Sequence, residues 1–204
     1  MEPELRVLSA AQLLNLYDTE LVSTFPAAEL MPFDTMRHLV DRGLYDLEGL
    51  YEGDTLLGYA LLCVDSVRDY ALIDYLGVLT GLRSGGMGTR LLELVKKHCS
   101  GYRGILAEVE APAGHSTLED TVIMRRLGFY KRGGFVRLPY DMSLFGVRYR
   151  TLVCPAAGAL PATGVLEAHQ RLYQGQFSQR CYERYVQLPL GNEKLRPFSP
   201  WAEV

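Results

Sequence analysis

The stretch of this chain most able to do chemistry is a glycine-rich loop at residues 83–88, with the sequence Arg-Ser-Gly-Gly-Met-Gly. It follows an apolar run at 70–78 and precedes a segment in which Met87, Leu91 and Val95 recur at helical spacing. A strand that leads through glycines into a helix N-terminus predicts a phosphate site, because the unpaired N–H groups of the first turn and the helix dipole both favour an anion.

Two familiar phosphate loops are excluded by the spacing. A Walker loop needs lysine directly after its second glycine, but Met87 follows Gly86. A dinucleotide fingerprint needs a third glycine, and leucine stands at position 91 instead. The loop therefore serves another kind of phosphate ligand.

The remaining pattern, Arg-x-x-Gly-x-Gly, resembles the pyrophosphate loop of the GNAT superfamily of acyl-CoA-dependent N-acyltransferases. Three other segments follow in that family's order. Residues 74–78 resemble its fourth strand, 105–110 its fifth strand, and 125–135 its closing helix and Tyr-x-x-x-Gly-Phe turn. The resemblance extends over residues 4–155 and implies the family's fold and donor substrate.

The resemblance implies that the loop backbone anchors the pyrophosphate of acetyl-CoA, with a charge-assisted bond from the Arg83 side chain. The preceding strand would pair with the pantetheine arm, and one of its N–H groups would polarise the thioester carbonyl. The implied cofactor-binding residues are Leu76, Gly77, Val78, Arg83, Ser84, Gly85, Gly86, Met87, Gly88 and Thr89.

Tyr130 occupies the position of the family's thiolate-protonating tyrosine. A phenol can donate a proton to the thiolate that develops in the transition state. The alternative is an amphipathic tyrosine packed against a helix end. Two nearby residues depart from the family, since Ile123 and Arg126 stand where many members have asparagine and alanine.

Three carboxylates are candidates for the general base. Alternation along 72–78 predicts that Asp74 shares a face with Leu76 and Val78, and Glu108 and Glu110 share a face of the next strand. Such carboxylates are costly inside apolar strands unless solvated or paired, so at least one is predicted to be functional. The family's use of a base on either strand favours Glu110 or Asp74 over Glu108, the alternative for each being a salt bridge to an arginine.

The composition of the chain limits the classes of protein to which it can belong. The 204 residues, 48% of them hydrophobic, suffice for one well-buried core. A net charge of −3 gives no general attraction to nucleic acid or an anionic membrane, so we expect neither as a partner. Four scattered cysteines and the lack of a secretory or membrane-length apolar segment predict reduced thiols and a cytoplasmic protein. The four histidines have no ligand spacing, so no metal site is expected.

The resemblance implies an α+β fold with a mixed, strongly twisted central sheet flanked by helices, and the periodicity of the chain predicts elements in a compatible order. Ser9 is a predicted helix N-cap, and Gly53 lies at a predicted hairpin turn. The expected strands are 5–8, 44–52, 56–64, 70–78, 105–110 and 147–153, and the expected helices are 10–23, 34–42, a helix after the loop, and one from a capping box at 116–119 toward 127.

A change in composition at 155–161, rich in proline and small residues, predicts a linker. We therefore expect an acetyltransferase domain at 1–155 and a linker with a C-terminal helical appendage at 156–204. Apolar residues after position 165 recur at helical spacing. This segment could pack on the core, form a dimer contact or form one wall of the acceptor site.

Together these features predict an enzyme that transfers an acetyl group from acetyl-CoA to a primary amine by direct attack in a ternary complex. The alternative is a catalytically silent acyl-CoA-binding or regulatory module. Neither candidate strand contains lysine or arginine, so Asp74, Glu108 and Glu110 should favour an acceptor that arrives as a cation. The sequence leaves open whether the acceptor is a small molecule or a peptide, and whether the chain forms a homodimer.

Overall fold

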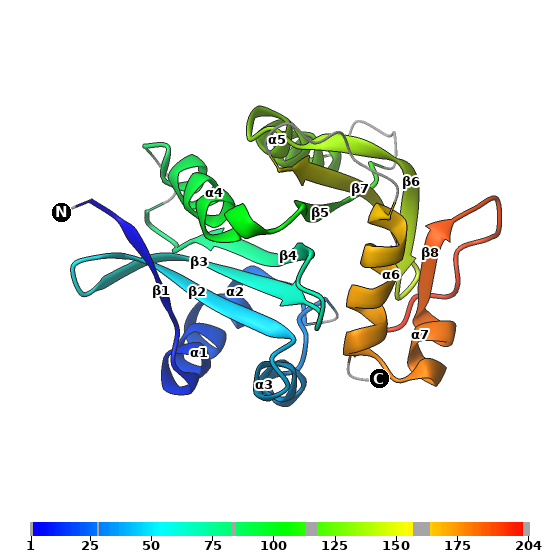
Figure 1. The fold of residues 1–204 in the computed structure, drawn as a ribbon, viewed down its shortest axis with the longest axis horizontal. Coiled ribbons are helices and arrows are strands. Elements are labelled where there is room, and N and C mark those ends of the chain that lie inside the picture. The colour runs from blue at the N-terminus through cyan, green and yellow to red at the C-terminus, as the bar shows by residue number, and fades with distance from the viewer. Residues whose placement is uncertain (1, 28, 83–84, 113–117, 157–163, 202–204) are drawn as a thin grey trace.

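A mixed eight-stranded sheet organises the chain in the computed structural model, which describes residues 2–27, 29–82, 85–112, 118–156 and 164–201 (Figure 1). The strand order is β1-β2-β3-β4-β5-β7-β6-β8. The strands are β1 (Glu4–Val7), β2 (Tyr45–Glu52), β3 (Thr55–Val64), β4 (Tyr70–Val78), β5 (Gly104–Glu110), β6 (Val136–Leu144), β7 (Val147–Pro155) and β8 (Val186–Leu190). The α-helices are α1 (Ala10–Leu16), α2 (Val22–Thr24), α3 (Phe33–Asp41), α4 (Met87–His98), α5 (Leu118–Arg132), α6 (Val165–Gln176) and α7 (Gln179–Tyr185).

The parallel pair β4–β5 opens the sheet at its centre. Their register runs from Tyr70 opposite Gly104 to Ile73 opposite Ala107 and ends there. Both strands continue beyond this point, but the rest of β4 pairs with β3 while Glu108–Glu110 pair with β7. The two strands therefore separate toward their C-terminal ends and leave space between them.

Helices cover both faces of the sheet. On one face, α1, α3 and α6 bury side chains such as Leu16, Met36 and Leu172 against β2–β4. On the other face, α4 and α5 bury side chains such as Leu91 and Ile123. Figure 1 shows α1 and α3 on the opposite side of β2 and β3 from α4. The predicted fold class, an α+β fold with a mixed sheet, is confirmed.

The N-terminal helix departs from a regular α-helix. Ser9 caps α1 with Gln12 in a capping box, as its position predicted. The helix does not run unbroken to residue 23, because a π-helical segment (Tyr17–Leu21) separates α1 from α2. Within this segment the buried Glu20 accepts hydrogen bonds from the N–H and hydroxyl of Thr80, just after β4. The irregular turn thus joins this helix to the end of the central strand.

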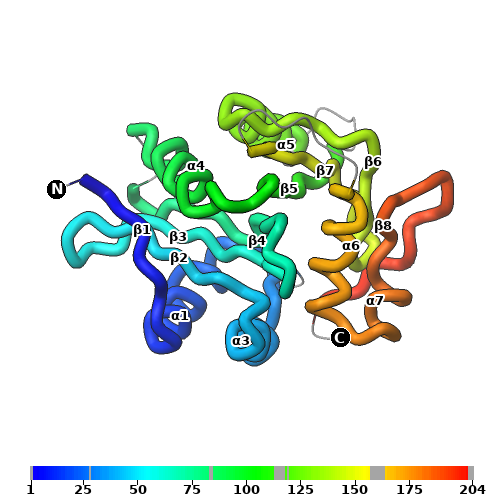
Figure 2. Tube along the Cα trace, viewed as in Figure 1, coloured from blue at the N-terminus to red at the C-terminus, as the bar shows by residue number. Residues whose placement is uncertain are grey.

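The C-terminal segment contains the expected helices and also the edge strand β8, which the sequence analysis did not anticipate. β8 pairs with β6, a strand that was also not foreseen. Figure 2 shows this segment lying beside β6. The break between the two helices falls at Phe177, the C-cap of α6, and Ser178, the N-cap of α7.

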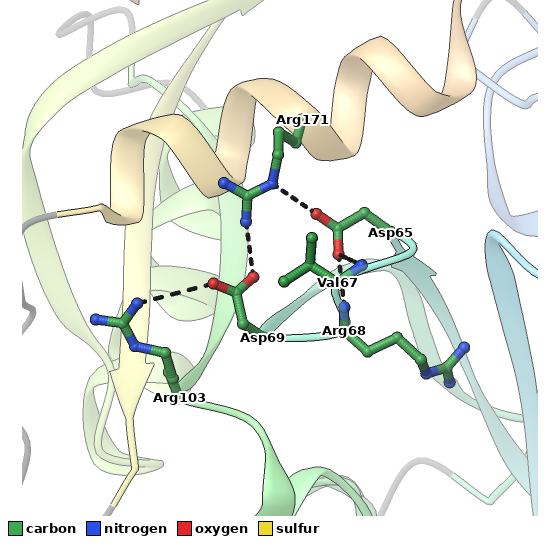
Figure 3. A network of polar contacts seen from close by, with 6 residues as sticks. All are labelled: Asp65, Val67, Arg68, Asp69, Arg103 and Arg171. Carbon is green, nitrogen blue, oxygen red and sulfur yellow. Dashed lines mark hydrogen bonds and ion pairs between the residues drawn. The ribbon is translucent and has the colours of Figure 1, made fainter.

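An ion-pair network fastens α6 to the turn between β3 and β4 (Figure 3). The Nε and Nη2 atoms of Arg171 donate to Asp65 at 2.9 Å and to Asp69 at 2.8 Å. Asp65 is buried and also accepts from the backbone N–H groups of Val67 and Arg68. Both aspartates precede β4, so the network places α6 across the start of the central strand.

Some expectations fall outside the described residues: Arg83 and Ser84, the capping box at 116–119, and most of the linker at 155–161. In the part of the chain that is described, no helix is long and apolar enough to cross a membrane.

Candidate active site

The glycine loop ends in a helix N-terminus that faces a cleft. Gly85 and Gly86 have φ angles of 75° and 80°, a left-handed conformation that glycine adopts without strain. Gly86 is the N-cap of α4, and the first helical hydrogen bond runs from the Arg90 N–H to the Gly86 carbonyl at 3.0 Å. The N–H groups of Met87, Gly88 and Thr89 therefore lie outside the helical ladder and can bind an anion.

We call the cavity in front of this helix the main cleft. Its volume is about 510 Å³. It lies where β4 and β5 separate, between the end of β4 and the last turns of α5. The main cleft is lined by Thr24, Phe25, Tyr59, Asp74, Leu76, Gly77, Val78, Gly86, Met87, Gly88, Thr89, Glu108, Val109, Arg126, Phe129 and Tyr130.

The main cleft brings together most of the residues expected from the sequence. Leu76, Gly77 and Val78 of β4 lie beside Gly86 to Thr89 of the loop and helix, and Tyr130 of α5 completes the wall. Gly85 belongs to the same loop but does not line the cleft. Glu110 lines a neighbouring pocket instead.

Asp74 is the extra residue of a β-bulge. Leu61 and Leu62 are adjacent in β3, but they pair with Tyr75 and Ile73 of β4, so Asp74 has no partner in the register. The strict alternation expected along 72–78 is therefore wrong beyond Asp74. Tyr75 packs in the same core as Leu72, whereas Leu76 packs against the core on the other face.

Gly77 allows β4 to approach a buried tyrosine. A Cβ atom at this position would lie 2.4 Å from the hydroxyl oxygen of Tyr59, whose side chain is fully buried. Only a residue without a side chain fits there while Tyr59 keeps its place. The cleft wall at Gly77 therefore consists of bare backbone, which suits strand-like pairing with an extended ligand.

A helix C-cap fixes Tyr130 at the cleft. The Phe135 N–H donates to the Tyr130 carbonyl at 3.0 Å, and Gly134 has a φ angle of 89°, as in a Schellman motif. The Tyr130 ring packs edge-on against Phe129 and Phe135. Burial raises the pKa of its phenol above the usual value, while the charge of Arg126 acts in the opposite direction.

A smaller cavity, which we call the side pocket, adjoins the main cleft and has a volume of about 160 Å³. Acidic and aromatic side chains dominate its walls. It is lined by Thr24, Phe25, Pro26, Glu29, Ile73, Asp74, Tyr75, Glu108, Glu110, Arg126, Leu144, Tyr149, Tyr173, Gln176 and Trp201. All three carboxylates singled out from the sequence therefore meet at this pocket.

The two glutamates of β5 have cationic or polar partners that the sequence analysis did not foresee. The Arg126 Nη1 donates to the Glu110 Oε1 at 3.3 Å. His169 Nε2 lies 2.7 Å from the Glu108 Oε1, and the Tyr173 hydroxyl donates to the Glu108 Oε2 at 2.6 Å. We expected no lysine or arginine near these carboxylates because β4 and β5 contain none. The observed partners come instead from the helices α5 and α6.

Asp74 has a different environment. It accepts a hydrogen bond from the Tyr45 hydroxyl, which lowers its pKa, but desolvation raises the pKa more strongly. The nearby Glu108 charge also raises it, and the pKa moves from its ordinary value of 3.8 to about 7. Asp74 is exposed to solvent through the cavity and has protein on its other sides. Its carboxyl can therefore exchange a proton near neutral pH.

Glu29 is a fourth carboxylate at the side pocket, and the sequence analysis missed it. It lies in the loop between α2 and α3, where no periodic pattern marks it. Tyr75 of β4 holds that loop, because its hydroxyl accepts from the Met31 N–H at 2.9 Å and donates to the Glu29 carbonyl oxygen at 3.3 Å. Desolvation and the Glu110 charge raise the pKa of Glu29.

Aromatic and polar residues from the C-terminal third of the chain form another part of the side pocket: Tyr149, Tyr173, Gln176 and Trp201. Of the three roles left open for the C-terminal segment, packing on the core and forming a wall of this pocket are both present. Helical spacing alone signalled core packing, and nothing in it marked Tyr173 as a partner of Glu108.

Known proteins resemble this chain in sequence pattern and in fold. The model of the acetyltransferase (GNAT) family matches residues 10–135. Among curated proteins, none has a matching sequence. A protein described as a GNAT-family acetyltransferase from Bacteroides thetaiotaomicron superposes with a TM-score of 0.68 and 21% identity, over 84% of this chain and 96% of that chain.

Two further solved structures share the fold. The ribosomal-protein-S18-alanine N-acetyltransferase from Escherichia coli has a TM-score of 0.56 and 16% identity, over 78% of this chain and 97% of that one. The spermidine N-acetyltransferase from Vibrio cholerae, solved with CoA and spermine, has a TM-score of 0.56 and 11% identity, over 76% and 96%. At these identities the structures show the fold alone, while the family match spans more than half of the sequence. The chain belongs to the GNAT family of acetyltransferases.

Proposed function

We propose that this enzyme transfers an acetyl group from acetyl-CoA to a primary amine by direct attack while both substrates are bound. The main support is the junction of the main cleft with the side pocket. Five residues line both cavities: Thr24, Phe25, Asp74, Glu108 and Arg126. A donor in the main cleft and an amine in the side pocket would meet at this junction, which is the proximity that direct attack needs.

In this proposal the α4 N-terminus binds the pyrophosphate. The N–H groups of Met87, Gly88 and Thr89 supply donors, and Gly85 and Gly86 hold the turn. Arg83 and Ser84 are proposed to complete the loop. The backbone of Leu76, Gly77 and Val78 would pair with the pantetheine arm and polarise the thioester carbonyl.

Asp74 is the proposed general base. A base works best with a pKa near the operating pH, and the Asp74 pKa of about 7 meets that condition. Glu110 is paired with Arg126 and does not line the main cleft, which favours Asp74 over Glu110 as the base. Asp74 takes a proton from the ammonium group, directly or through water, and the free amine nitrogen then attacks the thioester carbon.

Tyr130 is the proposed general acid. As the carbon–sulfur bond breaks, the phenol donates its proton to the departing thiolate, and the second proton that the nitrogen loses as the amide forms returns to the phenolate, directly or through water. Burial keeps Tyr130 protonated across the physiological range, because its pKa lies above the usual value. Asp74 and Tyr130 both line the main cleft, so one group accepts a proton and the other supplies one on the same reacting centre.

The side pocket favours a cationic acceptor. Four carboxyl groups line it, from Glu29, Asp74, Glu108 and Glu110, against one guanidinium, from Arg126. The aromatic walls can add cation–π attraction. A volume of about 160 Å³ suits the end of one alkylamine chain. We therefore propose a polyamine, an amino sugar or a lysine-like side chain as acceptor, although this fold is compatible with many acceptors.

Release of free CoA from acetyl-CoA, measured across a panel of amines, tests this proposal. Cationic amines without a nearby carboxylate should be the best acceptors, and their KM should rise with salt, because solvated charges are screened beyond about 8 Å at physiological ionic strength. If glutamate or aspartate is the preferred acceptor, the charge argument is wrong.

Tyr130→Phe tests the acid. It should lower kcat by roughly 10²- to 10⁴-fold while leaving acetyl-CoA affinity near that of the parent. Tyr102→Phe, a change outside both cavities, is the matched control and should leave kcat unchanged. Unchanged turnover in Tyr130→Phe would assign Tyr130 to packing.

A further inference from the structure

Hydrogen bonds from α6 hold Glu108, a carboxylate that lines both cavities together with Asp74. Both oxygens of Glu108 are bound by α6, with His169 Nε2 at 2.7 Å from one and the Tyr173 hydroxyl at 2.6 Å from the other. His169 is fully buried, and its Nδ1 lies 3.3 Å from the Tyr140 hydroxyl of β6. Contacts at both oxygens fix the position of the Glu108 carboxylate.

The network has features beyond those needed for packing. A buried imidazole and a buried phenol are directed at a carboxylate that lines both cavities. The hydrogen bonds connect α6 to β5 across more than 60 positions of sequence, at the point where β4 and β5 separate. This placement keeps a negative charge beside Asp74 at the junction of the cavities.

We propose that Glu108, held by His169 and Tyr173, is a positioning residue that fixes a negative charge beside Asp74 at the junction of the two cavities and so strengthens Asp74 as a base. This inference rests on the proposed function only in taking Asp74 as the general base. The effect of the Glu108 charge on the titration of Asp74 can be measured without a substrate. A negative charge nearby disfavours a second one, so Glu108 makes Asp74 a stronger base.

Other groups facing Asp74 do not supply such a charge at neutral pH. Burial raises the pKa of the Cys63 thiol on β3 and of four phenols around Asp74, so these groups stay neutral. Glu110 is paired with Arg126, and the pKa of Glu29 is itself raised. The four phenols are Tyr45 of β2, Tyr75 of β4, Tyr149 of β7 and Tyr173 of α6.

The test is a direct titration of Asp74. Protein labelled with ¹³C at the aspartate carboxyl carbons is followed by NMR from pH 4 to 9, and the Asp74 signal is assigned by its loss in Asp74→Asn. In the parent, the midpoint should lie near 7. In Glu108→Gln, which keeps the shape but removes the charge, the midpoint should fall by about one pH unit.

Glu110→Gln is the matched control. It removes the other β5 carboxylate at the same pocket, but that charge is already paired with Arg126. Its Asp74 midpoint should therefore stay close to that of the parent. An equal shift in both variants would show a general effect of pocket charge and would overturn the specific role of Glu108.

Tyr173→Phe provides a second route if Glu108→Gln does not fold. It removes one donor to Glu108 and keeps the ring, so the Glu108 carboxylate is less firmly fixed beside Asp74 and the Asp74 midpoint should fall by a smaller amount. An unchanged midpoint in the folded variant overturns the proposal. A parent that shows no acetyl-CoA turnover but a normal shift in Glu108→Gln would instead contradict the proposed function and leave the coupling intact.

Discussion

Replacing Asp74 by asparagine should remove activity and, at alkaline pH, stabilise the fold. The Asp74 pKa is about 7 in the folded protein against an ordinary value of 3.8. Between these values the folded state holds a proton that the unfolded state releases. The stability from the protonated carboxyl is therefore fully present below about pH 4 and is lost as the pH rises through 7.

The size of the effect follows from this difference. Three pKa units correspond to about 4 kcal/mol as an upper limit. Asp74 is exposed to solvent, so screening reduces this value, and we expect about 1–2 kcal/mol. Asparagine stays neutral at every pH and can still accept the Tyr45 hydrogen bond. For a chain of this length the gain corresponds to a rise of about 2–8 °C in Tm above pH 8.

Thermal unfolding followed by circular dichroism between pH 4 and 9 measures this gain. The Tm difference between Asp74→Asn and the parent should be near zero at pH 4 and reach its maximum above pH 8. Glu110→Gln, the control, should show no such gain, because it breaks an ion pair with Arg126. A Tm difference for Asp74→Asn that does not change with pH would refute the raised pKa.

Three further perturbations test the donor site and the docking of α6. At about a hundredfold excess over its Kd, acetyl-CoA should stabilise the parent by roughly 2.7 kcal/mol and raise Tm by about 5–11 °C. Gly86→Asp should abolish this rise in Tm. Gly43→Asp is the control and should retain the rise, because Gly43 also has a positive φ but lies outside both cavities. Gly77→Ala should destabilise the fold by about 1–3 kcal/mol in urea unfolding and weaken acetyl-CoA binding, because the new methyl group meets a buried tyrosine at 2.4 Å. Arg171→Ala should cost about 1–3 kcal/mol by the same measurement, since it leaves the buried carboxylate of Asp65 without its guanidinium; a loss equal to that of an exposed arginine would contradict the network.

Local patterns predicted the parts of the site that local chemistry determines. The glycine spacing located the N-terminus of α4, and an apolar run located β4 with its observed bounds. The Tyr-x-x-x-Gly-Phe segment forms the helix end at which Tyr130 lies. In each case neighbouring residues and one well-defined turn are sufficient to form the structure.

The remaining features depend on contacts between distant residues. Alternation assumes a regular strand, so it could not show the bulge at Asp74, which depends on the register with β3. The partners of Glu108 lie 61 and 65 positions away in sequence, and no periodicity connects them. Strand β8 directly follows α7, where the helical pattern of the preceding residues hid its start.

The two cavities are lined by different regions of the sequence, and this affects how such an enzyme can evolve. Residues of the main cleft all lie between 24 and 130, inside the region that the family model matches. Tyr149, Tyr173, Gln176 and Trp201 of the side pocket lie beyond it. If the side pocket binds the acceptor and the main cleft binds the donor, as we propose, substitutions after residue 135 redirect the enzyme to another amine without altering the donor site. A duplicated copy could diverge in the same way, and a library randomised at these four positions would be a compact starting point for engineering new specificity.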